Sequence, residues 1–168
     1  MKNLLKRFAP EIMLTILAAN VLVALVSLLT GYAQIPFDTT LSKAIGILLV
    51  GIVAAIFYAA QKALGKGING RVEPRCECQE LITSGIYSYV RHPIYLAFFI
   101  GLLAIDVMAR SYLAFAMTML LALPSLLWRA RVEDSALKER FGQQWESYAR
   151  NVPAFIPRLT NLRRQKSH

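Results

Sequence analysis

Charged residues are scarce in this sequence of 168 residues, and their scarcity limits the class of protein. Asp, Glu, Lys and Arg together make up 17% of the chain, whereas 56% of its residues are hydrophobic. A typical soluble domain carries about 25% charged residues, so this chain holds more apolar side chains than a globular core of its size needs. The composition excludes most soluble folds and predicts a membrane protein.

Lysine and arginine are absent from the interiors of four apolar segments. Each segment approaches the roughly 20 residues that cross a bilayer core of about 30 Å, although the third and fourth are short. We therefore expect an all-α fold, a single polytopic membrane helix bundle over residues 1–168 with about four transmembrane helices. The predicted spans are residues 11–31, 43–62, 93–109 and 111–129, with a connector over 63–92 and a tail over 130–168.

Very little chain separates the third predicted span from the fourth. Only Arg110 lies between them, so we expect these two helices to form a tight hairpin. Asp106 stands four residues before Arg110, a spacing at which opposite charges can pair across one turn of a helix. We interpret the two as an ion pair at the membrane boundary with no further function.

Basic residues are nearly missing from one side of the predicted bundle. Only Lys43 and Arg110 fall in the loops of that side, whereas seventeen Lys and Arg residues lie in or beside the N-terminal segment, the connector and the tail. The positive-inside rule then predicts that both termini, the connector and the tail are cytoplasmic. The expected membrane is the cytoplasmic membrane of a bacterium or archaeon, or the endoplasmic reticulum of a eukaryote. We expect the net charge of +9 to attract anionic lipid headgroups rather than nucleic acid.

Cysteine and histidine are also rare. The chain has two cysteines, Cys76 and Cys78, and two histidines, His92 and His168. A structural zinc site takes about four such ligands, so we expect no metal site. Both cysteines fall in the predicted cytoplasmic connector, where thiols stay reduced. We expect ordinary thiols there, with acylation beside the membrane as a lesser alternative.

A glycine-rich segment at residues 65–70 matches the pattern G-x-G-x-x-G. The dinucleotide-binding fingerprint needs a strand before this pattern and a helix after it, so that phosphates meet the N-terminus of the helix. Here a predicted transmembrane helix precedes it, and Arg71-Val72-Glu73-Pro74 follows. We interpret the glycines as the end of the second span and a turn.

The tail predicts an amphipathic helix from residue 131 to about residue 150. Its apolar stripe consists of Leu137, Phe141, Trp145 and Tyr148, at helical spacing. Such a helix lies on the membrane surface or over the bundle. Just before it, Arg129 and Glu133 share a helical face, either as a structural ion pair or as part of a site.

A second polar cluster opens the third span. Pro93 suits the first turn of a helix, and His92 then lies beside backbone donors suited to an anion. A histidine at this position can equally be a hydrogen-bonding anchor, and Tyr87, Tyr89 and Tyr95 can equally form an aromatic belt. The residues alone leave both interpretations open.

Together these motifs resemble the isoprenylcysteine carboxyl methyltransferase and phospholipid methyltransferase group of integral membrane enzymes. The resemblance covers about residues 72–158, and the first two spans match only in being apolar. It rests on Thr83-Ser84-Gly85-Ile86-Tyr87, Arg91-His92-Pro93-Ile94-Tyr95, Arg129, Glu133-Asp134, Phe141-Gly142-Gln143-Gln144-Trp145-Glu146-Ser147-Tyr148, Val152-Pro153 and Pro157.

The resemblance implies S-adenosylmethionine as cofactor. It implies that Glu133 is the acidic contact of the cofactor, that Arg129 faces the acceptor substrate, and that Arg129 and His92 are the catalytic residues. The family often has a second glutamate where this chain has Asp134, so we rank Asp134 below Glu133. The implied cofactor-binding residues are Gln79, Glu80, Leu81, Ile82, Tyr87, His92, Pro93, Ile94, Tyr95 and Glu133.

The chemistry of these side chains agrees with that cofactor. Arg91 or the amides near His92 can bind its carboxylate, and Tyr87 or Tyr95 can pack its adenine or face its sulfonium. The expected acceptor is a lipophilic molecule that enters from the bilayer, and the carboxylate of a prenylcysteine-like molecule is favoured. A phospholipid amine, a thiol and a non-enzymatic protein that binds lipid or a partner remain as alternatives.

Overall fold

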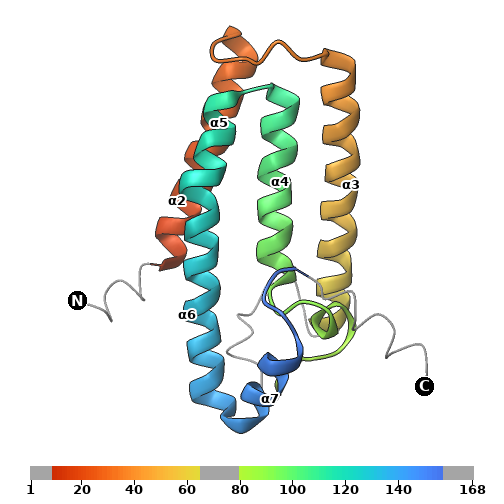
Figure 1. Ribbon diagram of the computed structural model, residues 1–168, viewed down its shortest axis with the longest axis vertical. Helices are drawn as coiled ribbons and strands as arrows, with labels where there is room; N and C mark the ends of the chain where they lie inside the picture. The colour runs from red at the N-terminus through yellow and green to blue at the C-terminus, as the bar shows by residue number, and fades with distance from the viewer. Residues whose placement is uncertain (1–8, 65–79, 157–168) are drawn as a thin grey trace. The chain divides into compact units, whose positions relative to one another are not determined.

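The computed structural model describes residues 9–64 and 80–156, and their regular structure is helical (Figure 1). The expected all-α class is confirmed, since these residues form no strand and only an isolated bridge between Gln34 and Ser111. The predicted glycine-rich turn and both cysteines lie outside the described residues. In chain order the elements are α2 (Ala9–Thr30), α3 (Thr39–Leu64), the 3-10 turn η2 (Gly85–Ser88), α4 (Pro93–Ala109), α5 (Tyr112–Met117), the π-helical turn η3 (Thr118–Ala122), α6 (Leu123–Phe141) and α7 (Gln143–Asn151).

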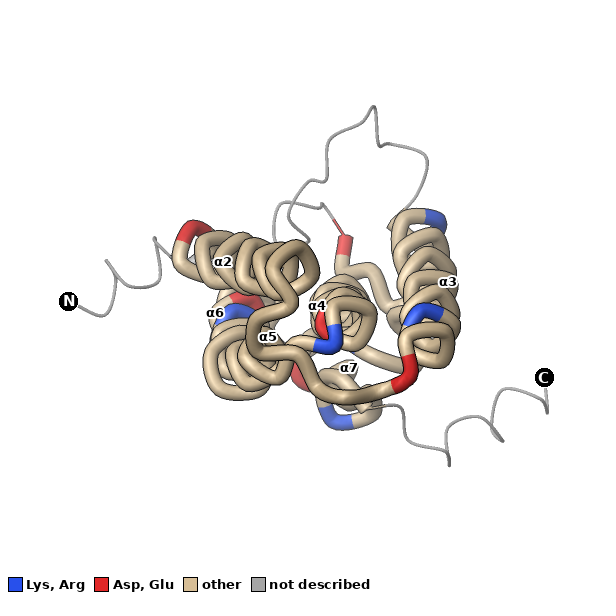
Figure 2. The backbone as a smooth tube through the Cα atoms, turned by 90° about the horizontal axis from the view of Figure 1, so that it is seen from above, with Lys and Arg blue, Asp and Glu red and all other residues tan. Residues whose placement is uncertain are grey.

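Three of the described helical stretches are long and apolar enough to cross a membrane. They are Pro10–Thr30, Thr39–Leu64, and the continuous stretch Tyr112–Phe141 that runs through α5, η3 and α6. The fourth apolar helix, Pro93–Ala109, is shorter. In Figure 2 the tubes of α2, α3 and α4 are tan over most of their length, and charged residues lie toward their ends. The chain is therefore a membrane protein, and each of the four apolar segments is helical.

The chain divides into two compact units. The first consists of Met1–Ala54 with Ala97–Arg129, and the second consists of Ala55–Leu96 with Ala130–His168. Three long helical stretches, α3, α4 and the one that ends in α6, contribute residues to both units. Each unit is described below by itself.

In the first unit, α4 and α5 form the expected tight hairpin. Arg110 turns the chain with a φ of 53°, and the side chain of Ser111 caps α5 by accepting from the Ala114 amide. The Arg110 guanidinium donates to the Phe37 carbonyl (3.1 Å) and to Gln34 Oε1 (2.9 Å). The predicted Asp106–Arg110 pair is wrong, since no such ion pair occurs among the described residues. The spacing rule assumes a continuous helix, and the helix ends before Arg110.

Buried polar side chains join α2 to the second arm of this hairpin. Asn20 Nδ2 donates to the Ala114 carbonyl (2.9 Å) and to Thr118 Oγ1 (2.8 Å), and Thr118 Oγ1 donates to Asp106 Oδ2. Small residues on both helices, among them Ala24 and Ala114, let the backbones approach closely (Figure 1). Hydrogen bonds and close packing thus replace the hydrophobic effect, which cannot drive association between helices in lipid.

In the second unit, the predicted amphipathic helix is present in two pieces. α6 runs on from the apolar stretch to Phe141, and Gly142, with a φ of 50°, separates it from α7. The predicted apolar stripe is buried within its own unit. Leu137 and Tyr148 pack with Leu81 and Val152, and Phe141 and Trp145 pack against them.

Candidate functional site

The candidate site lies in the second unit, where α4 begins. Pro93 is the first residue of α4, as predicted, and is fully buried. The two residues before it are tied to the segment after α7. The Arg91 amide donates to the Pro153 carbonyl (2.9 Å) and the His92 amide donates to the Ala154 carbonyl (3.0 Å). Both amides are therefore bonded within the protein, and the expectation that free amides of the first turn of α4 bind an anion stays a prediction.

Asp134 of α6 contacts both residues that precede α4. Its Oδ2 lies 3.0 Å from Arg91 Nη1, and its Oδ1 lies 2.9 Å from His92 Nε2. The side chains are mostly buried, with exposed fractions of 14% for Arg91, 17% for Asp134 and 1% for His92. Charge-assisted hydrogen bonds in such a place are shorter and stronger than neutral ones. The sequence ranks Asp134 below Glu133 as a contact of the cofactor. In the structure, Asp134 holds the two residues that precede α4.

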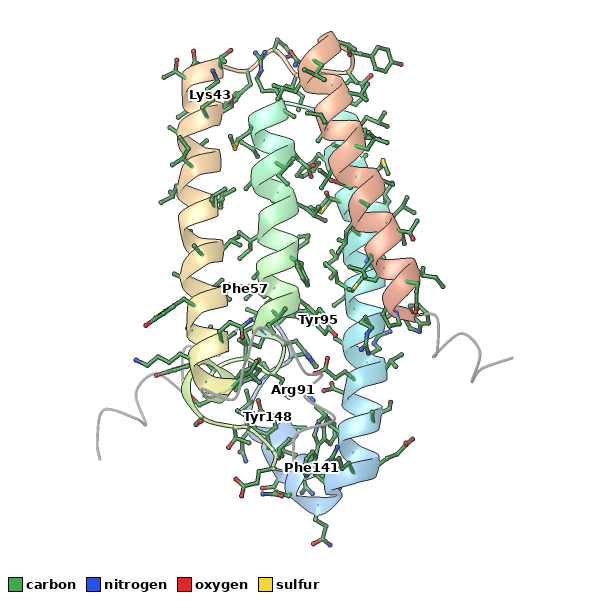
Figure 3. The ribbon with its side chains drawn as sticks, turned by 180° about the vertical axis from the view of Figure 1, so that it is seen from behind. Lys43, Phe57, Arg91, Tyr95, Phe141 and Tyr148 are labelled. Carbon is green, nitrogen blue, oxygen red and sulfur yellow. The ribbon has the colours of Figure 1, made fainter. Side chains whose placement is uncertain are left out.

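Glu133 has a different partner. Tyr95 Oη donates to Glu133 Oε2 at 2.7 Å, so Tyr95 occupies one oxygen of the carboxylate that sequence spacing also allows to pair with Arg129. The Tyr95 ring stacks on His92 with a centroid distance of 5.6 Å, and the Phe155 ring lies 5.8 Å from His92. Arg91 and Tyr95 are labelled at the start of α4 in Figure 3.

A cavity of about 500 Å³ lies in the same unit. The predicted residues Glu80, Leu81 and Ile82 line it, together with Thr83, Ser84 and the end of α3. This volume falls in the range of about 300–1,000 Å³ that is usual for small-molecule sites. The described lining consists mainly of one short segment and carries one charged side chain, that of Glu80.

The remaining predicted residues are placed differently. Tyr87 is 1% exposed, and its carbonyl accepts from Tyr148 Oη at 2.7 Å, so it belongs to the core of the second unit. Ile94 is half-buried in the first turn of α4, and Arg129 is half-buried on α6 as the last residue of the first unit. Gln79 lies outside the described residues.

The structure thus gathers six of the predicted residues into two groups of the second unit. His92, Tyr95 and Glu133 are joined by stacking and a hydrogen bond, and Glu80 to Ile82 line the cavity. The contacts of Asp134 were missed on sequence grounds. A signal for them was present, because Arg91 and His92 offer two adjacent donors and Asp134 is an acidic residue on the helix that carries Glu133.

A helical membrane protein with an acidic pair facing a His-Pro helix start is the class that the fold and these contacts define. Residues 41–144 match the sequence profile described as phospholipid methyltransferase. The match covers more than half of the chain, and the chain belongs to the phospholipid methyltransferase family.

Three relatives illustrate the similarity. The chain is 34% identical over 150 residues to the nickel-cobalt-cadmium resistance protein NccN of Alcaligenes xylosoxydans xylosoxydans, covering 87% of this chain and 65% of that protein. It is 38% identical over 82 residues to protein-S-isoprenylcysteine O-methyltransferase of Schizosaccharomyces pombe, covering 46% and 33%. It is 32% identical over 74 residues to methanethiol S-methyltransferase of Pseudomonas deceptionensis, covering 44% and 27%. The chain spans less than two thirds of each relative, and the resemblance to the isoprenylcysteine methyltransferase group is confirmed.

Proposed function

We propose that the chain is an S-adenosylmethionine-dependent membrane methyltransferase that acts on a lipophilic acceptor at the cytoplasmic interface. The carboxylate of a prenylcysteine-like molecule is the favoured acceptor. The observation that carries the proposal is the pair of neighbouring carboxylates on α6 that engage the Arg-His-Pro-Ile-Tyr start of α4. Family membership and the names of two relatives support the same chemistry.

The described residues fit a ligand that carries an ammonium group, hydroxyls and an aromatic ring. Tyr95 occupies only Oε2 of Glu133, and Glu133 is half-buried, so its second oxygen can accept from a hydroxyl or an ammonium group. Glu80 gives the cavity an acidic group, and Thr83 and Ser84 give it hydroxyls. These donors and acceptors, with the Tyr95 ring, make up a binding set for S-adenosylmethionine.

The role of the protein in such a reaction is mainly to position groups. S-adenosylmethionine, when bound, supplies an electrophilic methyl group on a sulfonium. A carboxylate acceptor needs no proton removed, so the chain has to orient the acceptor and exclude water. We assign the orientation of an anionic acceptor to Arg129, whose planar guanidinium can hold a carboxylate by two hydrogen bonds.

Other acceptors remain candidates on specific grounds. The family description names phospholipids, whose amine headgroups are one alternative acceptor, and one relative is named for a thiol. A relative is named for resistance to metals, yet in residues 9–64 and 80–156 no group of three or more His, Cys, Asp or Glu side chains could hold an ion. An anionic acceptor remains favoured because Arg129 is a cation.

The test measures cofactor binding and methyl transfer separately. We expect the purified protein in detergent to bind S-adenosylmethionine saturably and to transfer labelled methyl groups into a total lipid extract. The substitution Glu133→Gln should weaken cofactor binding roughly ten- to a hundredfold, because a hydrogen bond to a charged group contributes about 1.5–3 kcal/mol. Glu139→Gln is the matched control, since Glu139 is exposed on the same helix. Absence of cofactor binding in a protein that still binds lipid would support the non-enzymatic alternative.

A further inference from the structure

Asp134 uses both of its carboxylate oxygens within the protein. Oδ2 pairs with Arg91, and Oδ1 pairs with His92. A carboxylate held by two donors on neighbouring residues has a fixed orientation, and it fixes those donors in turn. The group therefore contributes to a site through the residues that it holds, not through a direct contact with a ligand.

His92 is enclosed on all sides that the structure describes. Tyr95 stacks on its ring, Phe155 lies against it, Asp134 binds Nε2, and the backbone amide is bonded to the Ala154 carbonyl. The side chain is 1% exposed. The bond to Asp134 restricts rotation of the His92 ring, and the stacking between the two rings restricts the orientation of Tyr95.

Tyr95 in turn restricts the orientation of the second carboxylate, that of Glu133. Its hydroxyl donates to Glu133 Oε2 at 2.7 Å, and Glu133 is the residue with an oxygen left for a ligand. The path from Asp134 through His92 and Tyr95 to Glu133 begins and ends on adjacent residues of α6. It is a closed ring of contacts, and each member restricts the next.

We propose that Asp134 is a positioning residue of the methyl-transfer site, acting through His92 and Tyr95 on the orientation of Glu133. The inference rests on the proposed function. It also gives His92 a positioning role, because its Nε2 is bonded to Asp134 and its ring stacks on Tyr95.

A double-mutant cycle tests the path. Asp134→Asn keeps the shape of the side chain and can still form hydrogen bonds, and Tyr95→Phe removes only the hydroxyl that reaches Glu133. Affinity for S-adenosylmethionine and melting temperature are measured in detergent for the wild type, the two single variants and the double variant. Glu146→Gln serves as the control, because it breaks the exposed Lys138–Glu146 pair of the same unit.

We expect each single variant to lose about tenfold in cofactor affinity. The double variant should lose no more than the single variant that binds the cofactor more weakly. Such non-additivity is expected because both changes release the same carboxylate. Asp134→Glu should recover part of the affinity, since it restores the charge that Arg91 needs. The control should bind as the wild type does.

The proposal would be overturned if the fold loss in cofactor affinity of the double variant equalled the product of the two single losses. Asp134 would then act independently of Tyr95. A fall in melting temperature with unchanged affinity would also overturn it, because that result indicates a structural ion pair alone. A wild type that binds no S-adenosylmethionine removes the proposed function itself, and this inference with it.

Discussion

Two adjacent carboxylates on α6 have different partners because of the geometry of a helix. Consecutive residues of an α-helix point about 100° apart, so Glu133 and Asp134 reach different parts of the α4 start. Glu133 meets the Tyr95 hydroxyl and Asp134 meets Arg91 and His92. Tyr95 thereby engages one oxygen of Glu133, whereas Arg91 and His92 engage both oxygens of Asp134.

Arg129 provides a prediction at the scale of one residue. We expect Arg129→Lys to lower methyl transfer at least about tenfold, because a point charge cannot reproduce a planar contact with two hydrogen bonds. Cofactor affinity should change less than about threefold, since the residue serves only the acceptor. Turnover, affinity and melting temperature are measured on one preparation, with Arg131→Lys, an exposed neighbour, as control. Equal loss in all three measurements would exclude Arg129 from the acceptor site.

Some side-chain contacts of the candidate site could be expected from the sequence, and others could not. The resemblance to the family implies that His92, Tyr95 and Glu133 line one cofactor pocket, and the structure brings their side chains into contact. That they bind a cofactor stays a prediction. The contacts of Asp134 span more than forty residues of chain, and no local spacing rule reaches that far. The predicted Asp106–Arg110 ion pair is absent from the described residues for the opposite reason. The four-residue spacing brings two side chains together only within a helix, and α4 ends at Ala109.

At the scale of elements, α3 and α4 approach each other closely within the first unit. A Cβ atom on Gly46 would lie 2.1 Å from Met108 Cγ and 3.3 Å from the Ala104 carbonyl oxygen, whereas a Cβ atom on Gly51 of the same helix would meet nothing within 4 Å. A larger residue at position 46 would force its neighbours on α4 to shift. The methionine can move aside, but the carbonyl belongs to the backbone of α4.

The two glycines give a matched pair of variants. We expect Gly46→Ala to destabilise the protein by about 1–3 kcal/mol, the usual cost of overpacking. Gly51→Ala should be neutral or slightly stabilising, because alanine favours a helix more than glycine does. Thermal unfolding in one detergent compares them. A Gly46→Ala protein as stable as the wild type would contradict the prediction of overpacking between α3 and α4.

The break at Gly142 was not predicted, although the apolar stripe that crosses it was. Helical spacing continues from Leu137 through Phe141 to Trp145 and Tyr148, so periodicity alone favours one helix. The structure instead separates α6 from α7 there, and all four side chains still pack in the core of the second unit. Hydrophobic periodicity predicts which residues face a core, but it does not predict where the chain turns between them.

For the whole molecule, the distribution of charge predicts topology. We expect Lys43 to face the non-cytoplasmic side and the tail to face the cytoplasm, because seventeen of the nineteen basic residues lie in or beside the N-terminal segment, the connector and the tail. Lys43→Cys and Thr160→Cys, each made after Cys76 and Cys78 are changed to serine, are labelled in intact cells with an impermeant thiol reagent. Labelling of both positions from one side would contradict the proposed orientation.

The number of apolar helices was predictable at this scale, and the division into two units was not. The mean hydropathy of neighbouring residues is a local quantity, so a long apolar segment can be recognised from the sequence alone. The unit boundaries at Ala54 and Arg129 fall inside continuous helices. They depend on contacts between distant segments, which leave no mark in the local composition.

The hydrogen bonds of Asn20 have a consequence for the order in which the protein is made. Asn20 belongs to α2, and its acceptors, Thr118 and the Ala114 carbonyl, are separated from it by more than ninety residues of chain, so they are synthesised well after it. Until those residues are synthesised, the amide must find other partners in the membrane, because an unsatisfied polar group in hydrocarbon costs several kcal/mol. The Asn20 side chain therefore makes these two bonds only after the stretch Tyr112–Phe141 has been synthesised, so assembly of the first unit waits for that stretch.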